Sequence, residues 1–123
     1  MKAVTNESSE NYLETILILS TKLPVVRSID IANELEFSKA SVSVAMKHLR
    51  EDNHIEVSDA GFITLTKSGK DIAKMIYERH TLLTEWLVSL GVDETTASDD
   101  ACRIEHVISK KSFQALKKHI KNK

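Results

Sequence analysis

The stretch 28–52, SIDIANELEFSKASVSVAMKHLRED, decides the fold because it predicts two short helices joined by a tight turn. Ser28 is a suitable N-cap for a helix over 29–35 and Ser38 for a second over 39–52, because a serine hydroxyl accepts from the free amides of a first turn. Apolar residues recur at helical spacing on both helices and must be buried together: Ile31, Ala32, Leu35, Val42, Ala45 and Leu49. This pattern is typical of a helix-turn-helix.

The sequence on either side of this stretch predicts a wing and a supporting helix. Residues 55–58 alternate apolar and polar, Gly61 allows a turn with positive φ, and 62–65 alternate back, which predicts a β-hairpin. Apolar residues at three and four spacing predict an earlier helix over 7–22, which Pro24 ends. Helix-turn-helix followed by a hairpin is the order of a winged helix-turn-helix.

The C-terminal half is expected to be helical throughout. Thr66 is a suitable cap for a long helix to about Leu90, and Gly69 near its start is expected to weaken nothing important. Asp93 caps a fifth helix with an apolar stripe within 97–108, and a final basic helix follows. The predicted fold is therefore mainly α.

Composition limits the function. The chain has 123 residues and a formal net charge of −1, so it is not a domain that coats nucleic acid by bulk charge. Residues 37–50 nevertheless contain two lysines, an arginine and a histidine but no acid, which makes one face locally basic. No apolar run approaches the roughly 20 residues of a membrane helix, and the single cysteine cannot form an internal disulfide. We therefore expect a cytoplasmic protein that has no membrane partner.

The second helix of the motif is expected to enter the major groove of DNA. Side chains at its N-terminal end would meet base edges, and flanking cations would hold phosphates. The expected base-facing residues are Ser38, Lys39, Ser41 and Ser43, and the expected phosphate contacts are Arg27 and Lys47. The alternative is that these residues only form a solvated polar face.

A second motif is the segment 102–106, CRIEH, near the end of the chain. On a helix it places Cys102, Glu105 and His106 together at i, i+3 and i+4. A thiolate, a carboxylate and an imidazole suit Fe(II), Co(II), Ni(II) or Zn(II) better than Mg(II) or Ca(II). Further ligands are needed, and the candidates are His80, Asn11 and Glu14. The alternative is a small buried thiol beside a solvated Glu–His pair.

Catalysis by the same motif is not expected. Cys102 and His106 could serve as nucleophile and base, but on successive turns of one helix they lack a separate orienting group and oxyanion donors. The sequence therefore indicates a binding protein and not an enzyme.

The chain resembles the iron- and manganese-dependent transcriptional repressors typified by the diphtheria toxin repressor and the manganese transport regulator. The resemblance covers nearly the whole chain, and its most specific segments are 99–109, 12–16, 65–70 and 79–80. It implies a winged helix-turn-helix domain over 1–72 and a helical metal-binding and dimerisation domain over 73–123. It also implies a homodimer that binds palindromic operators of metal-uptake genes when metal is bound.

The resemblance also bears on the metal. Cys102, Glu105 and His106 match the primary-site motif of the iron-type branch, whereas the manganese-type branch has a carboxylate in place of Cys102. The thiolate therefore favours Fe(II), with Mn(II) as the alternative and Co(II), Ni(II) or Zn(II) as possible substitutes.

Four of five further positions depart from one branch or the other. Asn11 stands where the iron branch has a methionine and the manganese branch an aspartate, and an amide oxygen is a weaker donor than either needs. Glu14 matches the carboxylate of the manganese branch, and His80 matches a histidine of both. Thr84 and Ser98 replace a glutamate and a histidine of the iron branch's ancillary site. We therefore expect one hybrid site per subunit.

The expected mechanism is that metal removes repulsion among carboxylates and fixes the two winged domains at one spacing. Two rival interpretations remain from the residues. One is a metal-independent winged-helix regulator that senses an organic ligand or oxidation of Cys102. The other is a metal-buffering protein without sequence-specific DNA affinity.

Overall fold

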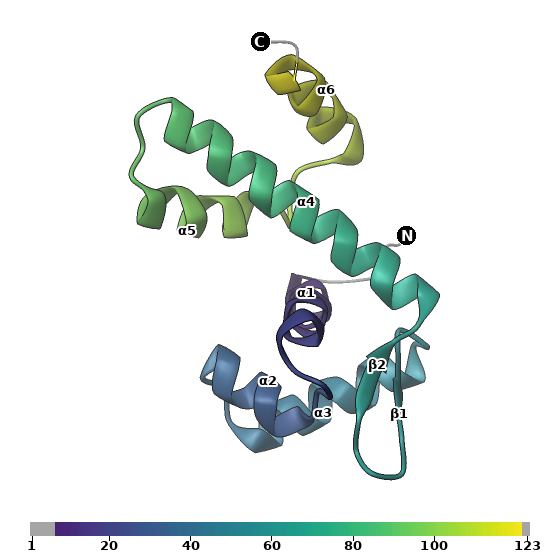
Figure 1. The fold of residues 1–123 in the computed structure, drawn as a ribbon. Helices are drawn as coiled ribbons and strands as arrows, with labels where there is room; N and C mark the ends of the chain where they lie inside the picture. Colours follow the sequence, from purple (N-terminus) through teal and green to yellow (C-terminus); the bar gives the residue numbers. More distant parts are fainter. Residues whose placement is uncertain (1–6, 122–123) are drawn as a thin grey trace. The chain divides into compact units, whose positions relative to one another are not determined.

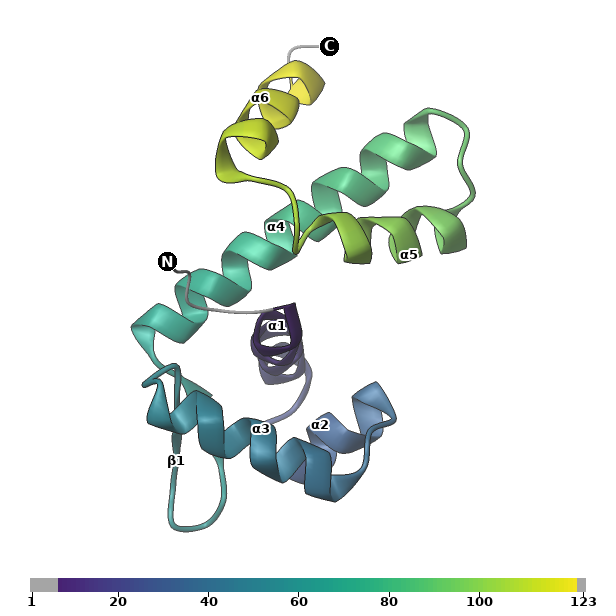
Figure 2. The same cartoon turned by 180° about the vertical axis from the view of Figure 1, so that it is seen from behind.

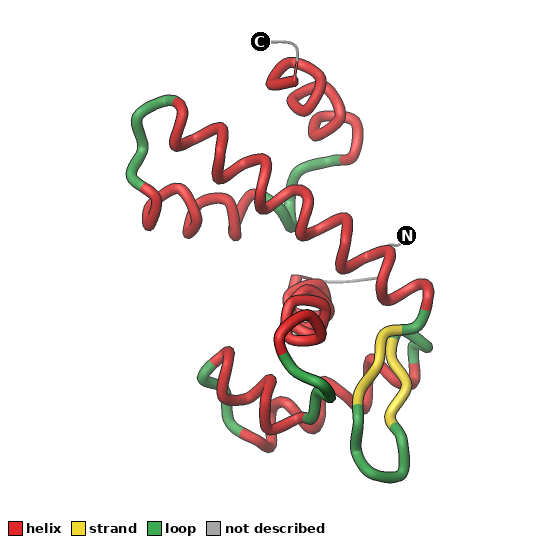
Figure 3. Tube along the Cα trace, in the orientation of Figure 1, coloured by secondary structure: helices red, strands yellow, loops and turns green. Residues whose placement is uncertain are grey.

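The computed structural model describes residues 7–121 and divides the chain into two compact units, 1–74 and 75–123. Figure 3 shows that helices dominate and that a single hairpin interrupts them in the described part. The elements are α1 (Glu7–Lys22), α2 (Ser28–Leu35), α3 (Lys39–Glu51), β1 (Ile55–Val57), β2 (Ile63–Leu65), α4 (Lys67–Ser89), α5 (Glu94–Ile104) and α6 (Lys110–Lys121) (Figure 1). The predicted mainly α fold with a winged helix-turn-helix is confirmed.

The helix-turn-helix forms as the sequence predicts, with one shift at a cap. Ser38 caps α3, since its Oγ accepts from the amide of Ser41 at 3.1 Å. At α2, however, Arg27 is the cap residue and its amide donates to Asp30 Oδ2 at 2.9 Å, so the expectation that Ser28 caps this helix is wrong. The first unit is built on one apolar core, whose fully buried members include Leu13, Ile16, Ile31, Val42, Leu49 and Ile55.

The wing is an antiparallel hairpin. Ile55 pairs with Leu65 and Val57 with Ile63, so that alternate side chains on each strand face the core. Gly61 takes the left-handed conformation, with φ of 84°, as a tight turn requires. The amide of Ile63 also donates to Val26 O at 2.7 Å, which fixes the hairpin to the link that follows α1.

Gly69 is required by a close approach between two backbones. The hydroxyl of Thr66 caps α4 and accepts from the Gly69 amide at 3.2 Å. A β-carbon on Gly69 would lie 1.9 Å from the carbonyl oxygen of His54, which itself accepts from the Thr66 amide. No side chain larger than hydrogen fits there, so glycine is a structural requirement at this position and not a weak point of the helix.

The second unit consists of the C-terminal part of α4 with α5 and α6. Figures 1 and 2 show that α5 returns alongside α4 after a short loop. Asp93 caps α5 and accepts from the Thr96 amide at 3.0 Å, a bond that lowers the pKa of the Asp93 carboxyl. Leu83, Ala101 and Phe113 bring the three helices into one buried cluster. This small core supports the end of α5, where the metal motif lies.

Candidate metal centre

The metal motif lies at the end of α5 and not inside it. The helix ends at Ile104, Glu105 is its C-cap residue, and His106 follows in a turn. The prediction that all three donors lie on one regular helix is therefore wrong, since only Cys102 does. The Glu105 amide still donates to Ala101 O at 2.9 Å, so the turn keeps helical geometry long enough to gather the donors.

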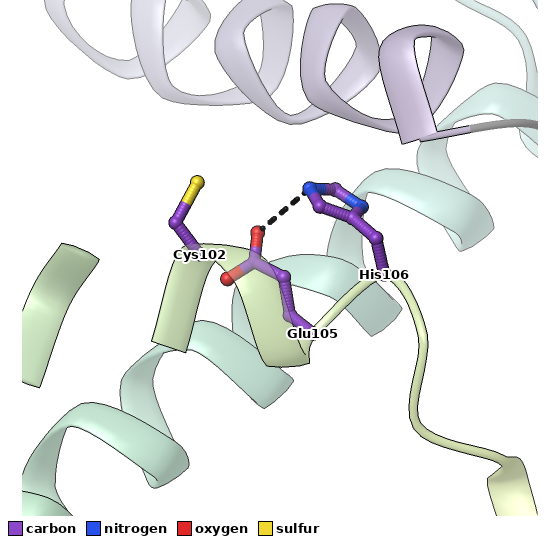
Figure 4. Close-up of side chains that lie close together, drawn as sticks. All are labelled: Cys102, Glu105 and His106. Atoms are coloured by element: carbon purple, nitrogen blue, oxygen red, sulfur yellow. Dashed lines mark ion pairs between the residues drawn. The ribbon is translucent and has the colours of Figure 1, made fainter. Parts of the chain in front are cut away.

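The structure brings these three side chains together. The sulfur of Cys102, a carboxylate oxygen of Glu105 and a ring nitrogen of His106 lie within 4.8 Å of one another. Figure 4 shows that they project to the same side of the chain, with the Glu105 carboxylate directed toward the His106 ring. The three potential ligand atoms of the predicted motif therefore lie together in one place.

Arg79 on α4 anchors the turn that carries Glu105. Its guanidinium is buried, and its Nη1 donates to the carbonyl oxygens of Glu105 at 3.0 Å and Ile108 at 2.9 Å. The same group lies 5.3 Å from the centre of the Phe113 ring, a cation–π contact. A cation that binds the last carbonyls of a helix satisfies acceptors that have no intrahelical partner. Arg79 is thus a positioning residue for the metal motif.

Glu105 is a buried carboxylate between two imidazoles. Its side chain has no exposed surface, its Oε1 lies 2.8 Å from His80 Nδ1, and its Oε2 lies 3.4 Å from His106 Nε2. Oε2 accepts no hydrogen bond from any described residue. A carboxylate buried at this depth is costly unless a positive charge or strong donors compensate it. The arrangement is therefore suited to a cation.

The donor set fits a divalent transition metal. A transition metal binds nitrogen, oxygen and sulfur atoms at about 2.0 to 2.3 Å. Three ligand atoms that lie within 4.8 Å of one another can reach one ion at these distances after small shifts of the side chains. The His106 side chain is 1% exposed and Cys102 is half-buried, so a bound ion would be largely shielded from water. The mixture of one soft and two harder donors matches the preference of Fe(II), Co(II), Ni(II) and Zn(II).

The remaining candidate ligands fall in both units. His80 on α4 belongs to the cluster through Glu105, and its Nε2 lies 3.4 Å from the hydroxyl of Ser98. Asn11 and Glu14 lie on α1 in the first unit, where Asn11 is half-buried and Glu14 is 7% exposed. The hydroxyl of Thr15 donates to the backbone carbonyl of Asn11, so this bond involves the Asn11 backbone and not its side-chain amide.

The predicted DNA-binding residues lie at the surface of the first unit. Lys39, Ser43 and Lys47 are exposed on α3, and Arg27 is exposed beside the wing with its guanidinium 4.9 Å from the Phe62 ring centre. Ser38 and Ser41 are also exposed, but they hydrogen-bond to each other at 2.9 Å as part of the helix cap. α3 thus presents cations and hydroxyls on a face that contains no acid before Glu51.

Replacing Arg79 by methionine is expected to lower the free energy of unfolding by about 3 kcal/mol, because the carbonyls of Glu105 and Ile108, in the turn that follows α5, lose a charged donor. Urea unfolding measures this change. Arg103→Met is the matched control, since Arg103 is exposed and, within residues 7–121, pairs with the neighbouring Asp100 at 3.3 Å. Equal effects of the two substitutions would contradict the anchoring role of Arg79.

Comparison with known proteins decides the family. Residues 66–123 match the metal binding and dimerisation domain of iron dependent repressors, and residues 5–61 match their N-terminal DNA binding domain. The regulator MntR of Bacillus pumilus is 34% identical over 113 residues, which cover 92% of this chain and 78% of that protein. This chain belongs to the iron-dependent repressor family.

Solved structures agree with this assignment. The manganese regulator SloR matches the repressor with a TM-score of 0.82 and 25% identity over 97% of this chain. A manganese-dependent transcriptional repressor in complex with manganese matches with a TM-score of 0.78 and 27% identity over 87% of this chain. The repressor spans 55% and 50% of these two longer chains, respectively.

Family membership assigns DNA binding to the first part of the repressor and metal binding with dimerisation to the second. The prediction that the chain is a transcriptional regulator and not an enzyme is confirmed. Among residues 7–121, no helix combines the length and the apolar character needed to cross a bilayer.

Proposed function

We propose that this repressor is a cytoplasmic homodimer that binds a palindromic operator when Fe(II) occupies a site containing Cys102, Glu105 and His106. The observation that carries this proposal is the fully buried Glu105 carboxylate between two imidazoles and close to a thiol. A bound divalent cation would supply positive charge directly beside this buried carboxylate. The genes it regulates would serve metal uptake or homeostasis.

Iron is preferred to manganese in this proposal because of Cys102. A thiolate is a softer ligand than the carboxylates and carbonyls that suit Mn(II), whereas imidazole and thiolate together suit Fe(II). Mn(II) remains the alternative, since the names of several relatives refer to manganese. Co(II), Ni(II) or Zn(II) would serve as substitutes in the laboratory.

His80, Glu14 and Asn11 are proposed to complete the ligand set. His80 already contacts Glu105 through its Nδ1. Release of that hydrogen bond would leave Nδ1 able to bind the metal. Glu14 offers a carboxylate and Asn11 an amide oxygen three residues earlier on the same helix. Loss of the Glu14 ligand is expected to weaken metal binding more than loss of Asn11, because an amide oxygen carries no charge.

The proposed DNA contacts divide by chemistry. Ser38, Lys39, Ser41 and Ser43 would approach base edges, since they lie at or near the N-terminal end of α3. Arg27 and Lys47 would hold phosphates, Arg27 from its place beside the wing residue Phe62. In a symmetric dimer the two copies of α3 would enter major grooves about one helical turn of DNA apart, which requires a palindromic site.

Selection from random DNA tests this function. With Fe(II) or Mn(II) present under anaerobic conditions, the repressor is expected to select a sequence with two-fold symmetry. Removal of the ion by a chelator should weaken binding to that sequence by at least about tenfold, which is within the usual range of coupling between two sites. Selection of the same sequence with equal affinity in chelator would contradict metal activation.

A further inference from the structure

The outward face of α3 carries an apolar side chain that a solvated helix does not require. Val44 is 56% exposed, whereas Val42 and Met46, two positions away on either side, are 0% and 5% exposed. At 3.6 residues per turn these neighbours point toward the core and Val44 points away from it. The exposed part of Val44 gains no stability from burial in the fold, so this side chain is available to contact an apolar group of a bound partner.

The residues around Val44 on α3 favour DNA over another protein as the partner of this face. Ser43, Lys47 and His48 are exposed neighbours on the same helix, and no acid occurs from Phe37 to Arg50. One valine among hydroxyls and cations is too small an apolar patch for a protein interface, which needs about 800 Å² per partner. The family assigns dimerisation to residues 66–123, so this face is not needed for a second copy of the chain.

From this juxtaposition we propose that Val44 recognises a thymine in each operator half-site by contact with its C5-methyl group. The inference rests on the proposed function, in which α3 enters the major groove. The thymine methyl group is the apolar feature of that groove, and small apolar side chains contact it. Serines and lysines on the same helix can bond to base edges or phosphates, but they do not favour a methyl group over a hydrogen.

Replacement of thymine by deoxyuridine tests this contact, because the two bases differ only by the C5-methyl group. In the operator that the wild-type repressor selects with metal bound, each thymine is replaced in turn, in both half-sites together. At one position per half-site the wild-type affinity is expected to fall about fourfold for each lost contact, or about 15-fold for both. Val44→Ala, which lacks two methyl groups, should reduce this thymine-to-deoxyuridine ratio at that position.

Two variants serve as controls. Val44 is exposed and alanine is the stronger helix former, so Val44→Ala is expected to fold as the wild type does. Lys47→Ala should weaken binding to every duplex but keep the wild-type ratio between thymine and deoxyuridine, because it loses a phosphate contact.

The outcomes separate this inference from the proposed function. Equal thymine-to-deoxyuridine ratios for wild type and Val44→Ala at every position, including ratios of one, would overturn the role of Val44 alone. A metal-loaded wild-type repressor that binds no selected duplex would overturn the proposed function, and the inference with it.

Discussion

Glu105→Gln is expected to lower the affinity of the repressor for its activating metal by about 100-fold or more while leaving the protein folded. Loss of an outer partner of a metal ligand already costs about 10- to 100-fold, and Glu105 is proposed as a ligand itself. Glutamine keeps the shape of the side chain but removes the buried negative charge. Metal titration and urea unfolding of the metal-free protein measure the two properties separately.

The fold is expected to tolerate this change because a buried charge contributes little net stability. Replacing buried ionic groups by neutral ones of similar volume is often neutral or stabilising. Asp99→Asn on the exposed side of α5 is the matched control, and it should alter neither metal affinity nor unfolding. If Glu105→Gln bound metal as tightly as wild type, the buried carboxylate would not be part of the metal site.

Gly69→Ala is expected to lower the free energy of unfolding by about 3 kcal/mol, the largest stability change predicted for a single methyl group in this chain. The added carbon would lie 1.9 Å from the His54 carbonyl oxygen, which is backbone and is already bonded to the Thr66 amide. Relief of that clash requires the start of α4 to move away from the wing, and overpacking of this kind costs about 1 to 3 kcal/mol or more.

The sign of this result is informative. Helix propensity alone predicts that alanine in place of glycine stabilises a helix by about 1 kcal/mol. Lys70→Ala, at the next and exposed position, is the control in urea unfolding and should change the stability little. An increase in stability for Gly69→Ala would show that the two backbones do not constrain each other.

Local signals in the sequence were sufficient to predict most of the fold. Ser38, Asp93 and Thr66 cap the helices for which they were predicted, and Gly61 provides the positive φ of the wing turn. Each of these signals acts within a few residues along the chain. The chemistry of the metal motif was also visible, because a thiol, a carboxylate and an imidazole occur within five residues.

Contacts between residues far apart in the chain could not be predicted from such local signals. Ile104 and Ile108 have helical spacing, which favours a longer α5, but Arg79 binds the carbonyls of Glu105 and Ile108 from another helix. Gly69 is needed only because His54 lies against it. Helical spacing places Val44 on the side opposite Val42 and Met46, but the degree to which that side of α3 is exposed follows from how the helix packs.

Metal stoichiometry and operator affinity, followed in one anaerobic titration of the metal-free repressor, test the central claim most directly. We predict that tight operator binding appears as one Fe(II) ion binds each subunit, and that Mn(II) produces the same state only at higher concentration. Operator binding that is equally tight in excess chelator would contradict the claim, and a redox or organic signal would then replace the metal as the effector.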